Sequence, residues 1–321
     1  MSLVSAHDTI ETIHFLLLPG FSMIGFVCAL EPLRVANRFR PGVYQWTIAS
    51  LDGKPVQASD GISILVDKSI AEINTAYCVF VVAGFRPLDH HTATVSHWLQ
   101  RISRQGAIVG AIDSGSFNLA EAGLLENHCI TLHWEAIPAF IERYPHLKVR
   151  QELFEISDRR MTCAGGTAAL DMMHDFISRR FGSEFAIQVS EQFVRGRIRN
   201  QSDQQRMQIA GRYGVHNKKV VQAINIMENN TENPWTTTEI AANMAITRRH
   251  LERLFKIYLN ETPTNFYLQL RLERARQLLQ QTEMTIMEIS VACGFESSSY
   301  FSRAYRIRFG LSPSKDRLSK K

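Results

Sequence analysis

The feature that most constrains the fold of this chain is a segment of about 21 residues that is repeated near its carboxyl end. Residues 236–256 (TTTEIAANMAITRRHLERLFK) align with residues 285–306 (TIMEISVACGFESSSYFSRAYR), and the second copy has one additional residue. Each copy begins with T-x-x-E, the capping box that starts a helix. Each then passes through a small residue into a second helical stretch. The repeat therefore predicts an all-α region with two helix-turn-helix units.

The spacing of apolar residues agrees with this prediction. In the first copy Leu251, Leu254, Phe255 and Tyr258 follow the i, i+3, i+4, i+7 pattern of one apolar helix face. The stretch 265–282 between the copies is amphipathic as well. A helix of that length would hold the two units side by side. Their second helices could then enter successive segments of the DNA major groove, ~34 Å apart.

The charge of the chain is divided unevenly between its halves. Residues 1–183 contain 15 Lys and Arg against 18 Asp and Glu, whereas residues 184–321 contain 21 against 13, a net charge of +8. A basic half joined to a near-neutral half indicates a polyanionic partner such as double-stranded DNA. A merely solvated basic surface is the alternative.

The cysteines and the first apolar run bear on the class of protein. The five cysteines, at positions 28, 78, 129, 163 and 293, are odd in number and form no C-x-x-C pair. This pattern argues against a disulfide framework and against a zinc site. The run TIHFLLLPGF is too short to span a bilayer. We therefore expect no metal, no cofactor and no membrane contact, and a cytoplasmic location.

The amino-terminal half alternates short apolar runs with helical stretches. The predicted strands are residues 12–18, 44–51, 77–84, 107–112 and 128–134, and the predicted helices are 22–39, 92–105 and 167–182. In the first of these helices Ile24, Val27, Cys28, Pro32 and Val35 lie near helical spacing. Such alternation predicts a flavodoxin-like, doubly wound α/β domain with a mostly parallel sheet.

One strand–turn–helix corner stands out in this half. AIVGAIDSGSFNLAEAGLL (107–125) predicts a strand, a sharp turn at Asp113, and a helix. Ligands of doubly wound sheets collect at the carboxyl ends of the strands. Further polar and aromatic residues are expected at those ends or on the first helix: Phe21, Glu31, Phe85, Ser114, His133 and Trp134. These side chains could form a catalytic set or could be ordinary loop residues.

The same pieces resemble the DJ-1/PfpI domain, also called class I glutamine-amidotransferase-like, over roughly residues 10–185. The resemblance rests on LLLPGFSMIGFVCALEPLRVANR, VFVVAGF, IDSGSFNLAEAGLL, TLHWE and MTCAGGTAALDMM. In the enzymes of that family the corner carries a cysteine assisted by a His and a Glu. The resemblance places Asp113, His133 and Glu31 at those positions. A carboxylate is a poor substitute for an attacking thiolate, so we expect a pocket that binds without catalysing.

Two acids beside aromatic rings would suit a cationic ligand. We therefore expect the effector to be a small amine, an amino acid or a quaternary ammonium compound. The predicted effector-binding residues are Phe21, Glu31, Phe85, Asp113, Ser114, His133 and Trp134. An acid neutralised by an internal hydrogen bond is the alternative.

The repeated region resembles the AraC-type DNA-binding domain over roughly residues 215–318. RRHLERLFK, RLERARQLL and EISVACGFESSSYFSRAYRIRFGLSP carry this resemblance. It implies that residues early in each second helix face bases, namely Arg248, Arg249 and His250, then Ser297, Ser298 and Ser299. An Arg can bind O6 and N7 of guanine with two hydrogen bonds. Arg253, Arg303 and Arg306 are better placed for phosphates.

The whole chain is similar to the GlxA-like branch of AraC-type regulators. Its corner is most similar to members that respond to arginine, glycine betaine or carnitine. The resemblance implies a sensor and dimerisation domain at 1–185, a linker helix at 186–214 and a DNA-binding domain at 215–321. It also implies a transcriptional activator rather than an enzyme. The implied partners are DNA, a small effector, RNA polymerase and a second copy of the chain.

Other interpretations stay open at this point. An active amidase or hydrolase fused to a DNA-binding module would need a cysteine in place of Asp113. A protein whose first half only dimerises would show no ligand-induced rise in melting temperature. In the linker, Arg195, Arg197 and Arg199 could contact DNA, contact the other domain, or be solvated alone.

Overall fold

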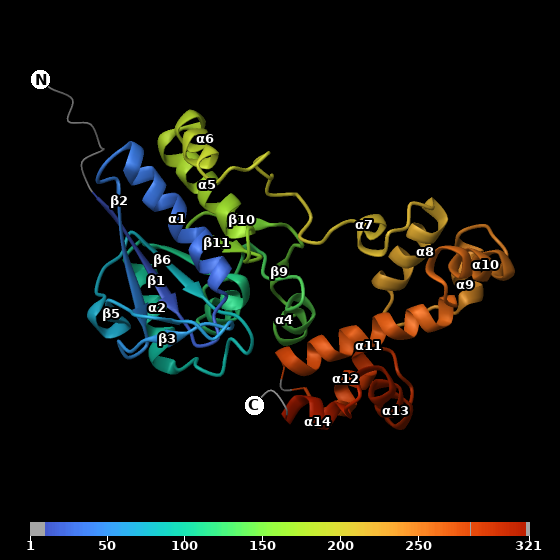
Figure 1. Ribbon diagram of the computed structural model, residues 1–321. Coiled ribbons are helices and arrows are strands. Elements are labelled where there is room, and N and C mark those ends of the chain that lie inside the picture. Colours follow the sequence, from blue (N-terminus) through green and yellow to red (C-terminus); the bar gives the residue numbers. More distant parts are fainter. Residues whose placement is uncertain (1–9, 283, 319–321) are drawn as a thin grey trace, which may run out of the picture. The chain divides into compact units, whose positions relative to one another are not determined.

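The computed structural model describes residues 10–282 and 284–318 (Figure 1). The chain divides into two compact units, and the division lies between residues 205 and 206. That point is inside the stretch 186–214, which is predicted to be a linker helix, but residues 192–208 are not helical. Each unit is described separately below. Among the described residues, no helix combines the length and the hydropathy that crossing a membrane requires.

The first unit is built on a seven-stranded sheet with the order β10-β11-β7-β6-β1-β2-β5. Its strands are β1 (Glu11–Leu17), β2 (Tyr44–Ser50), β5 (Lys68–Ser69), β6 (Cys78–Val82), β7 (Ile108–Ile112), β10 (Phe154–Ser157) and β11 (Arg160–Cys163). All neighbouring strands are parallel except β10 and β11, which form an antiparallel hairpin. Every residue of β6 is buried, as expected for a strand covered on both faces. The predicted doubly wound α/β fold is confirmed.

Two short pairs of strands lie outside this sheet. They are β3 (Val56–Gln57) with β4 (Ser63–Ile64), and β8 (Cys129–Ile130) with β9 (Lys148–Val149). The prediction of a sheet strand over 128–134 is therefore wrong, and β11 occupies the place beside β7. The reason lies at Thr131, whose N–H bonds the Thr162 hydroxyl and whose own hydroxyl bonds the carbonyl of Glu152. These side-chain hydrogen bonds replace a strand ladder after Ile130.

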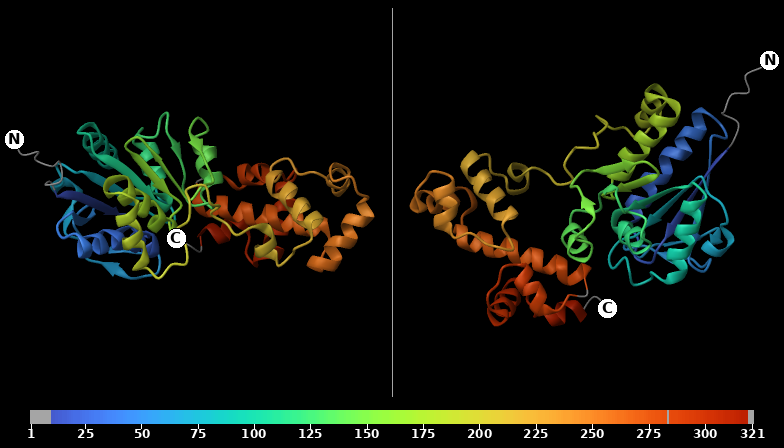
Figure 2. Two further views of the ribbon diagram at one scale, coloured as in Figure 1. Left: turned by 90° about the horizontal axis from the view of Figure 1, so that it is seen from above. Right: turned by 180° about the vertical axis from the view of Figure 1, so that it is seen from behind.

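Helices pack against the sheet (Figure 2). They are α1 (Met23–Phe39), α2 (Ala93–Arg104), α3 (Ser116–Glu121), α4 (Ile137–Arg143), α5 (Ala168–Phe181) and α6 (Ser183–Glu191), with 3-10 turns at Ile70–Glu72 and Asp113–Gly115. Helices α1, α5 and α6 pack together on one face and share a hydrophobic core with the sheet. Ile24 and Val27 are exposed, against expectation, because Gly25, Phe26 and Ala29 face the sheet instead.

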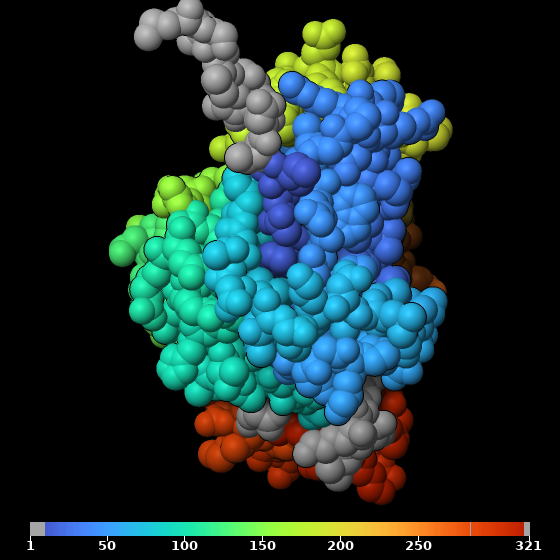
Figure 3. Space-filling view, turned by 90° about the vertical axis from the view of Figure 1, so that its left-hand side faces the viewer, coloured from blue at the N-terminus to red at the C-terminus, as the bar shows by residue number. Residues whose placement is uncertain are grey.

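The sheet carries a polar cleft at the starts of β1 and β2. Thr12 and His14 of β1 lie beside Gln45 and Thr47 of β2 in the register of the two strands. They line a cleft of about 530 Å³ whose rim includes Lys68. Figure 3 shows the start of β1, in dark blue, at this hollow. The expectation of uniformly apolar strands therefore does not hold at the beginning of β1 and β2.

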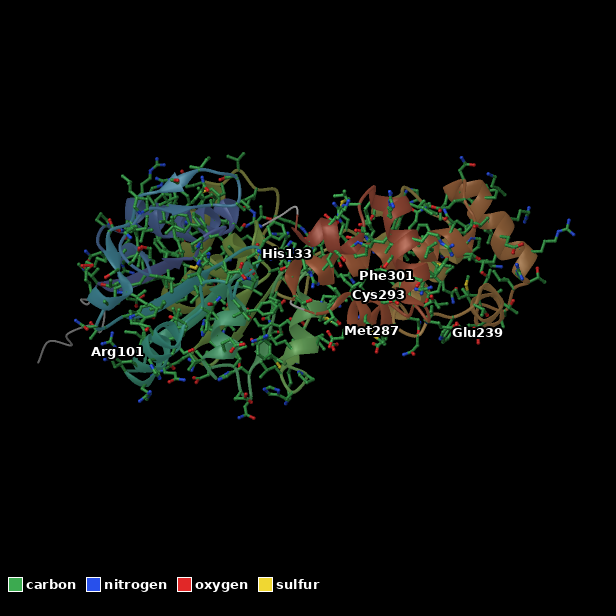
Figure 4. All side chains as sticks on the ribbon, turned by 90° about the horizontal axis from the view of Figure 1, so that it is seen from below. Arg101, His133, Glu239, Met287, Cys293 and Phe301 are labelled. Carbon is green, nitrogen blue, oxygen red and sulfur yellow. The ribbon has the colours of Figure 1, made fainter. Side chains whose placement is uncertain are left out.

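The second unit is all helical, as predicted. Its helices are α7 (Ile209–Tyr213), α8 (Lys218–Asn229), α9 (Thr237–Asn243), α10 (Arg248–Leu259), α11 (Pro263–Gln281), α12 (Ile286–Ala292), α13 (Ser298–Phe309) and α14 (Pro313–Leu318). The start of α11 packs into a core with α8, α9 and α10, whereas its later turns contact α12, α13 and α14. Cys293 and Phe301, both labelled in Figure 4, are fully buried beside α12 and in α13. The long helix α11 thus joins two helix-turn-helix units, as the repeat predicts.

The two copies agree in their backbone details. Capping boxes at Thr236 and Thr285 start α9 and α12. The turns contain Ala245 and Gly294, which both have positive φ angles. After the additional residue the copies are offset by 50 positions, and the pattern of buried and exposed residues over 251–260 is identical to that over 301–310. Tyr258 is 46% exposed, so it does not belong to the buried face that its spacing predicts.

Candidate effector site and nucleic-acid interface

The predicted strand–turn–helix corner is present at the end of β7. Asp113 has a φ of 63° and opens the 3-10 turn that leads into α3. The Ser114 hydroxyl donates a hydrogen bond to the carbonyl of Gly84, at the end of the neighbouring strand β6. A Cβ on Gly115 would lie 2.3 Å from the carbonyl oxygen of Val81, so a larger residue cannot be accommodated there. The corner is therefore held tightly against β6 and the residues that follow it.

The Asp113 carboxyl group is enclosed by this corner. A Cβ on Gly165 would lie 2.6 Å from Asp113 Oδ2, so only glycine allows the turn before α5 to close over the carboxyl group. Burial, together with the nearby charge of Glu135, raises the pKa of Asp113 to about 7. Hydrogen bonds from the Ser114 N–H and the Ser22 side chain oppose this shift. Near pH 7 the group can therefore exist in both protonation states.

The thiol nearest to the corner is Cys163, at the end of β11. Cys163 pairs with Ile112 in the register of the two strands and is fully buried. Burial raises its pKa to about 12, although the backbone N–H groups of Gly165 and Asp113 oppose the shift. At neutral pH this residue is a thiol and not the thiolate that nucleophilic catalysis requires.

Several of the predicted effector residues belong to segments that adjoin the corner. Ser114 belongs to the corner itself, and Phe85 follows Gly84 with 53% of its surface exposed. The turn after β8 carries His133 and Trp134, whose rings lie 5.7 Å apart, and Glu135 acts electrostatically on both His133 and Asp113. Burial lowers the pKa of His133, so its ring is neutral at pH 7. Glu135 is not among the predicted residues, although it directly follows the motif TLHW.

Two predicted residues have their side chains engaged elsewhere, although the Phe21 backbone pairs with Gly84 as an isolated bridge. Phe21 is fully buried and packs edge-on against Phe26, with 5.9 Å between ring centroids, so its ring belongs to the core. Glu31 lies nine residues beyond Ser22, which corresponds to roughly 13 Å along a helix. Its carboxylate is bonded to Arg34 at 2.7 Å. The residue of α1 that faces the corner is Gly25, next to Ile112 and Gly166.

The first candidate reading helix is α10. Thr247 caps it by accepting a hydrogen bond from the His250 N–H at 3.1 Å. Arg248 and Arg249 follow on the exposed first turn, and His250 is half-buried. Arg248 Nε bonds Glu252 one turn later at 2.8 Å, which restrains the arginine side chain.

The second candidate reading helix, α13, requires a shift of one residue in the prediction. Ser297 is its cap and accepts from the Tyr300 N–H at 3.3 Å, so it corresponds to Thr247 and not to Arg248. The residues that correspond to Arg248, Arg249 and His250 are then Ser298, Ser299 and Tyr300. Tyr300 is 45% exposed, and the sequence analysis misses it because the additional residue of the second copy lies in the turn before the cap.

The predicted phosphate-binding residues repeat between the copies. Arg253 in α10 and Arg303 in α13 are both exposed and lie 50 positions apart. Lys256 and Arg306 form a second exposed pair with the same offset. The two candidate reading helices therefore share a pair of exposed cations, three and six residues after the position of His250 and Tyr300.

Comparison with known proteins gives matches to both units. The DJ-1/PfpI family matches residues 11–179, and a helix-turn-helix domain family matches residues 240–319. The HTH-type transcriptional regulator CdhR of Pseudomonas aeruginosa is 56% identical over 94% of this chain and 90% of its own length. GbdR of the same species is 41% identical over 96% and 84%, and GlxA of Rhizobium meliloti is 37% identical over 98% and 97%.

Solved structures also resemble this chain. An AraC family transcriptional regulator from Pseudomonas putida superposes with a TM-score of 0.54 and 27% identity, over 57% of this chain and 99% of that one. A ThiJ/PfpI family protein from Pseudomonas syringae has a TM-score of 0.53 and 18% identity, over 70% and 88%. The second of these likenesses concerns the fold alone.

Proposed function

This chain belongs to the HTH-type transcriptional regulators that join a DJ-1/PfpI domain to an AraC-type helix-turn-helix domain, and on that premise we propose that the first unit is the sensor of a small cationic metabolite. The sensor site is the corner at Asp113, and the observation that carries the proposal is its enclosed carboxyl group with a pKa near 7. A regulator of this kind uses the ligand to change how its second unit acts on DNA.

The chemistry of the corner favours a cation. Asp113 and Glu135 supply two acids, while Phe85 and Trp134 supply aromatic faces. An ammonium group gains about 2 kcal/mol over an aromatic face when it is desolvated, and more from a carboxylate. The neutral ring of His133 adds a polar group without adding positive charge. Arginine, glycine betaine and carnitine, which the family resemblance suggests, all carry such a cationic group.

The same residues argue for binding without turnover. A carboxylate replaces the thiolate that would attack a carbonyl, and the buried thiol of Cys163 is protonated at neutral pH. The corner thus keeps the backbone of a nucleophile turn and lacks its nucleophile. We infer that the protein is a regulator and not an enzyme.

The second unit is proposed to read DNA with both copies. Bases are contacted from Arg248, Arg249 and His250 in α10 and from Ser298, Ser299 and Tyr300 in α13, while Arg253, Arg303 and Arg306 bind phosphates. The regulator acts in the cytoplasm as a homodimer and activates transcription through contact with RNA polymerase. These assignments rest on the exposed first turn of each helix and on the family.

Calorimetry tests the sensor site. We expect at least one of L-carnitine, glycine betaine and L-arginine to bind the full-length protein. A bound cation holds Asp113 ionised, so binding at pH 7 should release protons, and the measured heat should differ between buffers of different ionisation enthalpy. Asp113→Asn should weaken binding at least tenfold and abolish this buffer dependence.

The matched control is Glu142→Gln, which removes an exposed acid on α4. It should bind like the wild type. Binding that is indifferent to Asp113→Asn, or binding of uncharged metabolites alone, would contradict a cation site at this corner.

A further inference from the structure

The chain between α6 and the second unit is held against the first unit by residues 195–205, which we call the strap. Near its middle the Leu153 N–H donates to the Gln201 carbonyl at 3.0 Å, and the Gln201 side chain bonds both Glu152 and Glu155. Gln204 pairs with Glu152 as an isolated bridge. In Figure 1 this segment is the yellow trace that follows α6. The strap is therefore bonded along its length and is not a free linker.

The beginning of the strap is anchored on Asp171, in the first turn of α5. The Asp171 carboxylate is fully buried and accepts hydrogen bonds from Arg195 and from Arg199 Nε and Nη2, the latter two at 2.8 and 2.6 Å. The Arg199 backbone N–H also donates to it, at 3.2 Å. Several charge-assisted hydrogen bonds on one buried carboxylate make a strong and geometrically specific anchor.

This anchor adjoins the corner at Asp113. Helix α5 begins directly after the Gly165 turn that closes over the Asp113 carboxyl group. Arg199 Nη2 also bonds the Thr167 hydroxyl at 2.8 Å, one residue before that helix. A ligand that displaces the Gly165 turn would therefore displace the residues on which the strap is anchored.

The end of the strap adjoins the other wall of the same corner. Gln205 Nε2 bonds the Thr131 hydroxyl and the Leu132 carbonyl, both at 3.0 Å, and the Glu152 carbonyl at 2.8 Å. The next residue after Leu132 is His133, which belongs to the candidate effector site. Gln205 is also the last residue of the first unit.

We propose that Asp171 and Gln205 are positioning residues that hold the strap against the first unit. Binding of a ligand at the corner changes this hold, and so sets the length of free chain before the DNA-binding unit. This inference rests on the proposed effector site. With the strap held, residues 206–208 alone separate the first unit from α7. With it released, the free chain runs from residue 192 to residue 208. A longer flexible tether lowers the effective concentration of one reading unit beside another on adjacent half-sites. Coupling of this kind requires that the ligand bind the two states with different affinity.

Limited trypsin digestion of the full-length protein tests the anchor. Trypsin cuts after arginine, and the strap contains Arg195, Arg197 and Arg199. Asp171→Asn should speed cleavage between residues 195 and 206 at least tenfold, as followed by fragment mass. The matched control Asp175→Asn makes the same change one turn later on α5, where the acid pairs with Arg179. It should be cleaved like the wild type.

Gln205→Ala provides a second variant, because it removes no buried charge and leaves α5 intact. It should speed strap cleavage at least threefold. Equal cleavage rates in Asp171→Asn, Asp175→Asn and the wild type would overturn the anchor. If Asp171→Asn does not fold, an unchanged rate in Gln205→Ala has the same meaning.

The effector arm uses L-carnitine, glycine betaine and L-arginine as probes, and DNA selected by the wild-type protein from a random-sequence pool. A probe that raises the melting temperature should change both strap cleavage and DNA affinity at least threefold in the wild type. In Asp171→Asn it should still raise the melting temperature, with neither change. A probe that binds the wild type but changes neither strap cleavage nor DNA affinity would overturn the coupling. It would leave the sensor proposal standing. If no probe binds, the sensor proposal fails and the coupling fails with it, whereas the anchor is decided by trypsin alone.

Discussion

Asp113 in the first unit and Ala245 in the second are both non-glycine residues with a positive φ, 63° and 51°. Each lies in a tight turn that leads into a helix. The two turns differ in what their side chains do. At Ala245 the side chain is a methyl group, and the second copy has Gly294 at the same place. At Asp113 the side chain is an enclosed carboxyl group with a shifted pKa.

The two turns therefore differ in where the proposed functional residue lies. In the helix-turn-helix copies the turn redirects the chain, and the residues proposed to contact DNA follow in the first turn of the next helix. At the corner the residue in the strained turn is itself the proposed contact. A strained residue whose charge is also destabilised by burial is a typical feature of functional sites, which supports the proposed contact.

The largest effect is expected where the redirecting turn is most crowded. A Cβ on Gly294 would lie 2.5 Å from the Glu232 carbonyl oxygen and 2.6 Å from Pro234 Cδ. Gly294→Ala should therefore lower the unfolding free energy of the second unit by about 2–5 kcal/mol, from backbone strain and overlap together. Calorimetric melting of the full-length protein measures it. Gly310→Ala is the control, since it has a positive φ and open space around the added Cβ, and should cost only about 1–2 kcal/mol.

The next effect concerns the charge at the corner. Because the folded-state pKa of Asp113 is raised, its stabilising contribution is complete below about pH 4 and is lost as the pH rises through about 7. Asp113→Asn removes this dependence, so it should stabilise the first unit more at pH 8 than at pH 5, by at most about 3 kcal/mol. Melting temperatures across that pH range decide the point. A constant difference between variant and wild type would mean that the carboxylate is already ionised at pH 5.

A smaller effect distinguishes the two reading helices. Arg248→Ala should cost about 1–3 kcal/mol of DNA binding and relax the preference at one base pair. Ser298→Ala, at the matching place, should cost less than about 0.5 kcal/mol, because it removes no charge and no bidentate donor. Fluorescence titrations with the selected DNA and single-base variants compare them. Equal losses would show that the two copies contribute alike in spite of their different side chains.

The proposed phosphate contacts should behave differently from the proposed base contacts. Arg306→Ala should weaken binding to all sequences alike and reduce the slope of log K against log salt by about one. Titrations at several salt concentrations measure this slope. A change in base preference would instead place Arg306 in the groove.

The smallest effect is expected at the permissive turn. Ala245→Gly relieves positive-φ strain and adds chain entropy to the unfolded state, so the second unit should gain under about 1 kcal/mol. The same calorimetric melt measures it, with the wild type as reference. A loss of stability would mean that the Ala245 methyl group contributes packing that the turn needs.

Local patterns are sufficient for much of the fold. Both capping boxes, the turn and the buried face of α10 depend on residues within about one turn of each other, so the sequence predicts them. The strands β1, β2, β6 and β7 are predictable because long apolar runs have few other uses in a chain of this composition. The corner is predictable from its strand, turn and helix in succession.

Other features depend on contacts between distant segments. Helix α1 buries Gly25 and Ala29 where larger apolar residues are expected, because small residues let it approach the sheet closely. That choice of face turns Ile24 outward. Glu31 is separated from Ser22 by the rise of the helix, roughly 13 Å. Residues 128–134 look like a strand in sequence, but Thr131 bonds to a side chain of β11 and to the backbone of Glu152.

The exact start of a helix is also difficult to predict from the sequence. The DNA-facing residues of α13 are predicted at 297–299, whereas the residues that correspond to Arg248, Arg249 and His250 are 298–300. The prediction is one residue early because the second copy has one additional residue before its cap, and the alignment of the copies alone does not locate that cap. Only the hydrogen bond from the Tyr300 N–H to Ser297 fixes the start of that helix. Glu135 is likewise missed, since its proximity to Asp113 depends on how the turn after β8 folds.

The shared burial pattern of α10 and α13 has an evolutionary consequence. Since their inward positions alone hold the cores together, the outward ones can be replaced in one copy at a time without unfolding either. A descendant of this gene could therefore drift toward a new operator by altering one half of its recognition while the other half keeps it on the chromosome. Duplicated readers of this type offer natural selection a graded path between binding sites.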